Sequence, residues 1–299
     1  MIVIVTYNGL KWIDKCLQSC GDFPVVVVDN NSLDGTIDFI KLNYPKVHLI
    51  EQDKNLGFGQ ANNIGISYAL NQEAHYVFLL NQDAYLTDNC LNRLIKIQQN
   101  NTEYGILSPF HYKGSFTGLD DNFVMYMSRY KVSRDYIFDA NEGNIKEVYS
   151  IPFVNAAGWL IPKRTLESVG YFDSLFFHYG EDRNYCQRVL YHNMKIGIVP
   201  EAKMIHDREF REVKPVLKYS EEYYDEYLRY AKIKWADINL KGFDDGFYEH
   251  LKKLQLDYFK HLFKLKFKDG KDSFKKYKIL KSLYLSFKES RERNSNKFQ

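Results

Sequence analysis

The chain has 299 residues, enough to bury a full hydrophobic core as one large domain or as one domain with an appendage. A formal net charge of +3 is too small to indicate a nucleic-acid partner, and no apolar run reaches the roughly 20 residues of a membrane span. The four cysteines lack metal-type pairing, so we expect buried free thiols and a reducing, cytoplasmic location.

Strands and helices alternate through the first third of the chain. Short apolar runs predict strands at residues 2–5, 25–28, 47–50 and 76–80, and helical spacing of apolar residues follows the polar turns between them. This order is typical of an α/β fold with a mostly parallel sheet and helices on both faces.

Polar residues stand at the end of these strands, where parallel strands of one sheet share an edge. The candidates are Thr6, Tyr7, Asn8, Asp29, Asn31 and Asp83. A polar, phosphorylated ligand suits such an edge. A tyrosine there can stack on a base, and an aspartate can accept the imide N–H of uracil or thymine.

The strand around residues 76–80 runs directly into Asn81, Gln82 and Asp83. Asp83 therefore stands where a metal or a phosphate would be met. The alternative is that Asp83 only ends the strand and caps a helix starting near Thr87.

A dinucleotide fingerprint is only weakly matched at Gly57 and Gly59. The third glycine is missing, Asn62 stands in its place, and the turn follows the third strand rather than the first. A tight turn into a helix explains these glycines without a nucleotide cofactor of the NAD type.

The chain is less regular from about residue 105 to residue 150. After a strand at residues 106–109, we expect loops and edge strands up to about residue 150. A strand at 153–162 follows, in which Trp159 is either a core anchor or a platform for a sugar. Glu181 and Asp182 then begin a helix. Carboxylates are stabilised at a helix N-terminus, so the pair is either a simple charge preference or a chemical site. His206, after a strand at 196–200, is either structural or a metal ligand.

Taken in order, these pieces resemble the family 2 inverting glycosyltransferases of GT-A fold, in particular the rhamnosyltransferase-like branch of bacterial surface-polysaccharide assembly. The matching segments cover roughly residues 1–210. They are Val5 to Asn8, Val28 to Thr36, Asn55 to Asn62, Leu80 to Asp83, Gly158 to Ile161, Gly180 to Asp182, and His206.

The resemblance implies a role for each of these positions. Donor binding falls to Thr6, Tyr7, Asn8, Asp29, Asn31, Asn62, Asn81, Gln82 and Asp83. Asp83 and His206 would hold a divalent cation, Mg²⁺ or Mn²⁺, on the donor diphosphate. Asp182 would be the general base, Glu181 would shape the acceptor site, and Trp159 would face the acceptor sugar.

One position departs from the family's pattern, because Asn81 replaces the first acidic residue of its Asp-x-Asp motif. An amide oxygen can coordinate a hard cation but brings no charge. Metal affinity would then depend on Asp83, His206 and the diphosphate itself.

The end of the chain has a different character, since from about Pro215 it lacks strand signals and is rich in lysine and aromatics. We expect a GT-A catalytic domain at 1–212, with a nucleotide-sugar half at 1–108 and an acceptor half at 109–212, and a basic helical region at 213–299. That region would pack on the catalytic domain, dock on an anionic membrane or form a homodimer. The last residues, 291–299, are predicted to fray.

The expected function is inverting transfer of a sugar from a UDP- or dTDP-sugar to a saccharide or a lipid-linked saccharide, in surface polysaccharide or O-antigen assembly. A non-catalytic nucleotide-sugar-binding scaffold is the alternative. Nucleotide binding without turnover of any acceptor would favour the scaffold.

Overall fold

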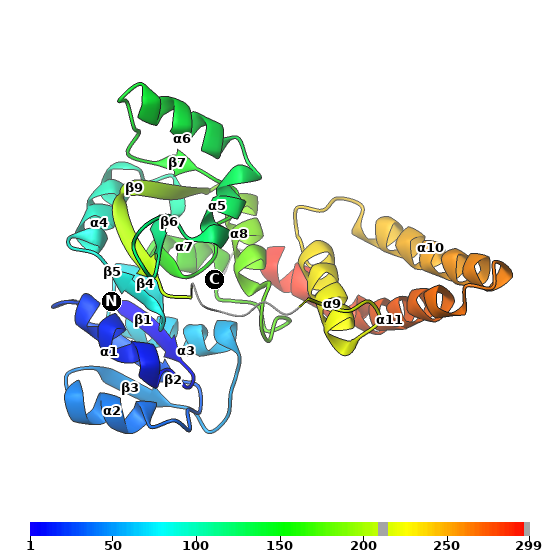
Figure 1. The fold of residues 1–299 in the computed structure, drawn as a ribbon, viewed down its shortest axis with the longest axis horizontal. Coiled ribbons are helices and arrows are strands. Elements are labelled where there is room, and N and C mark those ends of the chain that lie inside the picture. Colours follow the sequence, from blue (N-terminus) through cyan, green and yellow to red (C-terminus); the bar gives the residue numbers. More distant parts are fainter. Residues whose placement is uncertain (209–214, 296–299) are drawn as a thin grey trace.

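A nine-stranded sheet forms the centre of the computed structural model, which describes residues 1–208 and 215–295 (Figure 1). The strands are β1 (Ile2–Thr6), β2 (Val25–Asp29), β3 (His48–Glu51), β4 (Tyr76–Asn81), β5 (Ala84–Leu86), β6 (Tyr104–Lys113), β7 (Tyr149–Ser150), β8 (Gly158–Pro162) and β9 (Lys195–His206). The helices are α1 (Leu10–Ser19), α2 (Thr36–Asn43), α3 (Phe58–Asn71), α4 (Cys90–Asn100), α5 (Asp121–Ser128), α6 (Val132–Asn141), α7 (Lys163–Val169), α8 (Glu181–Tyr191), α9 (Glu221–Trp235), α10 (Phe243–Phe263) and α11 (Phe267–Ser295).

The first four strands are parallel, as predicted. β1 pairs with β2 and β4, and β2 pairs with β3. Thr6 lies opposite Asp29 and Val5 lies opposite Asn81, so the polar strand ends meet at one edge of the sheet. This is the arrangement that the sequence pattern predicted for the polar strand ends.

The rest of the sheet adds antiparallel pairings to these parallel ones. The strand order is β3-β2-β1-β4-β8-β6-β9-β5, with β7 also paired to β9. β8 is antiparallel to both β4 and β6, and β6 and β9 are parallel to each other. β5, a short strand that the sequence analysis did not predict, is antiparallel to β9.

Helices cover both faces of the sheet because the strands are apolar on both sides. Along β1, Val3 belongs to one buried cluster, while Ile2 and Ile4 belong to the other. Helices α1, α2 and α4 pack on the Ile2 side, and α3, α5, α7 and α8 pack on the Val3 side. The four cysteines are buried free thiols, as expected.

Two helices occupy the segment where loops and edge strands were expected. Asp120 caps α5, because its carboxylate accepts a hydrogen bond from the backbone N–H of Phe123. Phe123 and Met127 lie one helical turn apart and are buried, and α6 adds the buried Val132. The aromatic stretch therefore has helical periodicity, which the nearby glycines concealed.

The strands after residue 109 also differ in extent from the prediction. β8 starts only at Gly158, so residues 153–157 of the predicted strand lie outside it. β9 runs from Lys195 through Pro200 to His206, so it extends beyond the strand that was predicted at 196–200.

The C-terminal region is helical, as predicted, and Figure 1 shows that α10 and α11 form a hairpin pointing away from the sheet. Trp235 of α9, Phe247 of α10, and Leu280 and Phe287 of α11 form a third buried cluster. Among the described residues, no helix has the combination of length and apolarity needed to cross a membrane. The predicted domain boundary at residue 212 lies outside the described residues.

The far end of α11 returns to the α/β part of the chain and is helical to Ser295, contrary to the expected fraying. Arg291 donates hydrogen bonds to the carbonyls of Asp237 and Leu240. Ser290, Arg293 and Asn294 all donate to the buried carboxylate of Asp173, in the loop before α8. Of the predicted frayed segment, residues 296–299 lie outside the described residues.

Candidate functional site

A pocket of about 770 Å³ opens at the carboxyl edge of the parallel strands. Its lining comes from strand ends, from the start of α8 and from two arginines further along the chain. The predicted site residues in its wall are Tyr7, Asn8, Asn81, Gln82, Asp83, Glu181, Asp182 and His206. The two carboxylate groups predicted for metal binding and for proton transfer therefore share one pocket.

Asp83 and His206 are brought together by the unpredicted strand β5. Ala84 pairs with His206 across β5 and β9, and the Asp207 N–H donates to the Asp83 carbonyl at 2.7 Å. Asp83 Oδ1 consequently lies 3.4 Å from His206 Nε2. Burial alone would raise the pKa of Asp83, but the hydrogen bond and charge of His206 leave that pKa below its ordinary value. An ionised carboxylate beside an imidazole is a suitable pair of ligands for a divalent cation.

Asn81 ends β4 and Gln82 follows it, and their side chains differ in their hydrogen bonds. Gln82 Oε1 accepts from Thr6 Oγ1 at 2.7 Å and from the Tyr7 N–H at 2.9 Å, so it ties the end of β1 to the end of β4. The side-chain oxygen of Asn81 is buried and has no hydrogen-bond partner within the described structure. A buried acceptor without a partner is costly, which marks this oxygen as one that a ligand could satisfy.

Glu181 and Asp182 begin α8 directly after Gly180, whose φ of 97° is in the left-handed region that favours glycine. Glu181 is buried at 5% exposure, and Asp182 is half-buried with Oδ1 accepting from the Arg183 N–H at 2.7 Å. Burial, together with the charge of Asp182, raises the pKa of Glu181 to about 8. Burial also raises the pKa of Asp182. A proton on Glu181 at neutral pH therefore relieves the repulsion between the two carboxyl groups, and Asp182 is the more accessible of the pair.

Two arginines in the pocket wall were not predicted. Arg208 follows β9 and makes two hydrogen bonds to Asp120, at 2.9 and 2.8 Å. Its place two residues after His206 was a signal that could have been used. Arg229 comes from α9 of the C-terminal region, and its guanidinium lies 5.7 Å from the ring centre of Tyr179. Only the packing of α9 on α8 brings Arg229 to the pocket, and no local sequence pattern shows that packing.

The loop before α3 is held against the loop before α8 by a close approach at Gly57. A Cβ on Gly57 would lie 1.9 Å from the carbonyl oxygen of Phe177, and the φ of Gly57 is 80°. Gly57 therefore permits both the tight turn into α3 that was predicted and the close packing of the two loops beside the pocket.

Four predicted donor-binding residues do not lie in the pocket wall. These residues are Thr6, Asp29, Asn31 and Asn62. Asn62 is buried and donates to the Phe58 carbonyl, so it supports the first turn of α3. Asp29 is buried too. Its Oδ1 accepts from the Ser32 N–H, and its Oδ2 has no partner among the described residues. Tyr7, by contrast, is 45% exposed and free to stack on a ring.

The prediction that Trp159 faces an acceptor sugar is wrong. Trp159 is completely buried, and its ring stacks on Phe172 and packs against Tyr185. The side chains of β8 alternate between two covered faces, so Trp159 points into the core beneath α8 rather than into the pocket.

A comparison with family models identifies the catalytic part of the chain. The model described as "Glycosyl transferase family 2" matches residues 1–169, more than half of the sequence. Among related proteins, the dTDP-rhamnosyl transferase RfbF of Shigella flexneri is 27% identical over 219 residues, which are 68% of this chain and 67% of RfbF.

Solved structures show the same fold at low sequence identity. TarS of S. aureus in complex with UDP is 17% identical, with a TM-score of 0.53 over 79% of this chain and 64% of the TarS chain. The mannosyltransferase PcManGT of Pyrobaculum calidifontis, in complex with GDP-Man and Mn²⁺, is 17% identical, with a TM-score of 0.51 over 80% of this chain and 62% of its own. The chain thus spans about two thirds of these proteins, and the expected GT-A fold is confirmed.

Proposed function

Because this chain belongs to glycosyl transferase family 2, we propose that it moves a rhamnosyl or hexosyl group, with inversion, from a nucleoside-diphosphate sugar to an acceptor hydroxyl. The observation that carries the proposal is that Asp83 and Asp182, about a hundred positions apart in sequence, line one pocket. The pocket of about 770 Å³ is large enough for a nucleotide sugar.

The donor would lie along the edge formed by β1, β2 and β4. Tyr7 offers an exposed ring on which a base can stack, and Asn8 lines the pocket next to it. The unpartnered Oδ2 of Asp29, buried at the end of β2, is an acceptor of the kind that the imide N–H of uracil or thymine requires. These features favour a UDP- or dTDP-sugar.

A divalent cation, Mg²⁺ or Mn²⁺, fits the residues at the diphosphate end of this edge. Asp83 and His206 supply one carboxylate and one imidazole, and the Asn81 side-chain oxygen is buried without a partner. No cluster of three or more His, Cys, Asp or Glu ligands occurs within residues 1–208 and 215–295, so the donor phosphates would complete the coordination. When bound, such an ion neutralises the charge that develops on the leaving diphosphate.

The acceptor half supplies the proton transfer. Asp182 takes the proton of the acceptor hydroxyl while that oxygen forms its bond to the anomeric carbon. The bond from that carbon to the diphosphate oxygen breaks on the opposite face, which inverts the configuration. Glu181, protonated at neutral pH, avoids a second negative charge beside the acceptor and can donate a hydrogen bond to it. Arg208 and Arg229 provide positive charge in the same wall.

The acceptor is proposed to be a saccharide or a lipid-linked saccharide of a surface polysaccharide, met at the cytoplasmic face of a membrane. The basic C-terminal region is the part of the chain with the charge for a peripheral contact there. No nucleic acid is required at any step, and a homodimer would leave the proposed chemistry unchanged.

One substitution tests the assignment of proton transfer to Asp182. Asp182→Asn should lower the rate of sugar transfer at least about a thousandfold, because the amide cannot accept the hydroxyl proton, while donor affinity by calorimetry stays within about twofold. Thermal-shift measurements with a panel of nucleotide sugars and Mn²⁺ identify the donor for this assay. Equal loss of donor binding in Asp182→Asn would make Asp182 structural, and donor binding without transfer to any acceptor would make the protein a scaffold.

A further inference from the structure

Apolar side chains lie uncovered at the free end of the α10–α11 hairpin. We call residues 256–268 the hairpin tip. Near the base of the hairpin, Phe247 and Phe287 are fully buried, whereas at the tip Phe263 is 91% exposed and Leu265 is 74% exposed. Three further large apolar side chains are exposed there, namely Leu256, Phe259 and Phe267. Scattered exposed apolar residues are ordinary, but five of them between residues 256 and 267 form a patch.

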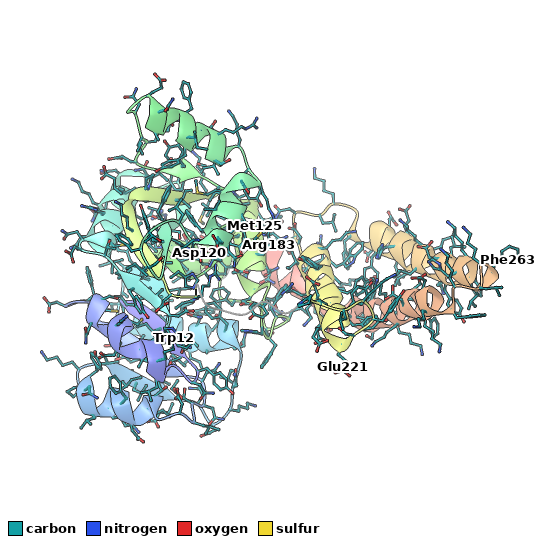
Figure 2. The ribbon with its side chains drawn as sticks, in the orientation of Figure 1. Trp12, Asp120, Met125, Arg183, Glu221 and Phe263 are labelled. Atoms are coloured by element: carbon teal, nitrogen blue, oxygen red, sulfur yellow. The ribbon has the colours of Figure 1, made fainter. Side chains whose placement is uncertain are left out.

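The position of this patch rules out a role in the hydrophobic core of the chain. Figure 2 shows Phe263 at the end of the hairpin farthest from the sheet. Contacts between the two helices near the tip come from Tyr258, whose ring packs on Phe274. The described elements leave the outward side of the tip open. The patch therefore faces away from the catalytic domain, ready to meet another surface.

Positive charge is interleaved with these apolar residues. The hairpin tip contains four lysines, at positions 260, 264, 266 and 268, and one carboxylate, that of Asp257. All four lysines are exposed, and within the described chain none of them forms an ion pair. The neighbouring Asp269 does not neutralise them, because it already binds Lys218 at 2.8 Å and the hydroxyl of Tyr219 at 2.6 Å.

We propose that the hairpin tip docks into the headgroup region of an anionic membrane. Phenylalanine and leucine side chains would enter the boundary of the acyl chains, while lysines reach the anionic headgroups beside them. A second copy of the chain is a poorer partner, since a two-fold contact through the tip would place lysines against lysines. The inference rests on the proposed function only for its purpose, which is to bring the enzyme to a lipid-linked acceptor.

Vesicle sedimentation of the full chain tests the proposal without any need for sugar transfer. With vesicles of phosphatidylcholine and 30% phosphatidylglycerol the protein should sediment, and with phosphatidylcholine alone it should not. Replacing Phe259, Phe263 and Phe267 together by serine should lower the partition coefficient by roughly a hundredfold. Replacing the four lysines of the tip by glutamine should lower it by a similar factor and abolish its dependence on salt.

A matched control removes as much exposed apolar surface from the catalytic domain. Leu42, Ile137 and Phe138 are 81%, 66% and 65% exposed, so their triple replacement by serine should leave vesicle binding unchanged. Unaltered thermal melting of all variants shows that the comparison is between folded proteins. In Phe263→Trp the tryptophan emission should shift to shorter wavelength on adding anionic vesicles, whereas in Phe138→Trp it should not.

The outcomes separate this inference from the proposed function. Equal binding of the wild type and the tip variants, equal binding to neutral and anionic vesicles, or no binding at all would overturn membrane docking and leave transfer chemistry untouched. If light scattering shows a dimer for the wild type but a monomer for the triple phenylalanine variant, and neither binds vesicles, the tip would be assigned to contact with a second copy instead. Vesicle binding by a chain with no transferase activity would support docking and count against the proposed function.

Discussion

The attachment of the C-terminal region to the catalytic domain can be tested at Asp173. Its side chain has no exposed surface, and it accepts hydrogen bonds from Ser290 Oγ at 2.5 Å, from Arg293 at 2.6 Å and from the side-chain amide of Asn294. In Asp173→Ala, Ser290 and Asn294 would be left buried without their acceptor, at a cost of about 1–3 kcal/mol for each group. Arg293 is 48% exposed and can turn to solvent, so its loss adds little.

The expected destabilisation of Asp173→Ala is therefore about 3 kcal/mol, or roughly 6–12 °C in Tm for a chain of this size. Circular dichroism measures the melting temperature, and limited trypsin digestion should cleave the lysine-rich helices α10 and α11 earlier in the variant. Asp269→Ala removes a carboxylate whose partners lie at the surface, so it serves as the control and should leave Tm nearly unchanged. A Tm for Asp173→Ala within about 2 °C of the wild type would refute the reasoning.

The same residue predicts a dependence of stability on pH. Burial alone would raise the pKa of Asp173, but the hydrogen bond from Ser290 and the nearby arginines leave it below the ordinary value. A carboxyl group with a depressed folded-state pKa stabilises the fold above its unfolded pKa of about 3.9 and loses that contribution as the pH falls. The Tm difference between wild type and Asp173→Ala should accordingly be constant above about pH 5 and shrink below pH 4.

The remaining predictions concern the pocket. Asp83→Ala should weaken donor binding in Mn²⁺ by about tenfold or more and leave binding in chelator unchanged; equal affinities for the two proteins in Mn²⁺ would remove the metal role. Glu181→Gln should keep most of its activity at pH 7, where Glu181 is protonated, and should lose the inflection of the rate near pH 8; an inflection that persists would assign it to another group. Arg229→Ala should lower kcat/KM by about tenfold without changing Tm, and rescue by lysine would distinguish its charge from its packing.

The donor half of the site could be predicted because its information is local. Each strand of the parallel half is a short apolar run, and the residue that follows it is polar, so topology alone brings Tyr7, Asn81 and Asp83 to one edge. The start of α8 was predictable for a similar reason, since Gly180 and the two carboxylates are consecutive.

What could not be predicted depends on contacts between distant segments. Trp159 has a side chain that suits either a core or a sugar, and only the covering helix α8 decides between them. Strand β5 is three residues long, and its partner β9 lies about 120 residues further along the chain. The mixed sheet follows from the insertion of β8 between β4 and β6, which no single strand encodes.

The C-terminal region links two features that the sequence shows as unrelated. Helix α9 carries Arg229 into the pocket wall, and α11 fixes the same region to the catalytic domain through Asp173. The hairpin tip lies at the other end of the body that α9, α10 and α11 form around Trp235 and Phe247. A membrane contact at the tip would thus orient the pocket through packed helices rather than through a flexible linker. Loosening the attachment at Asp173 should therefore reduce activity with a lipid-linked acceptor more than with a soluble one, because only the former depends on that orientation.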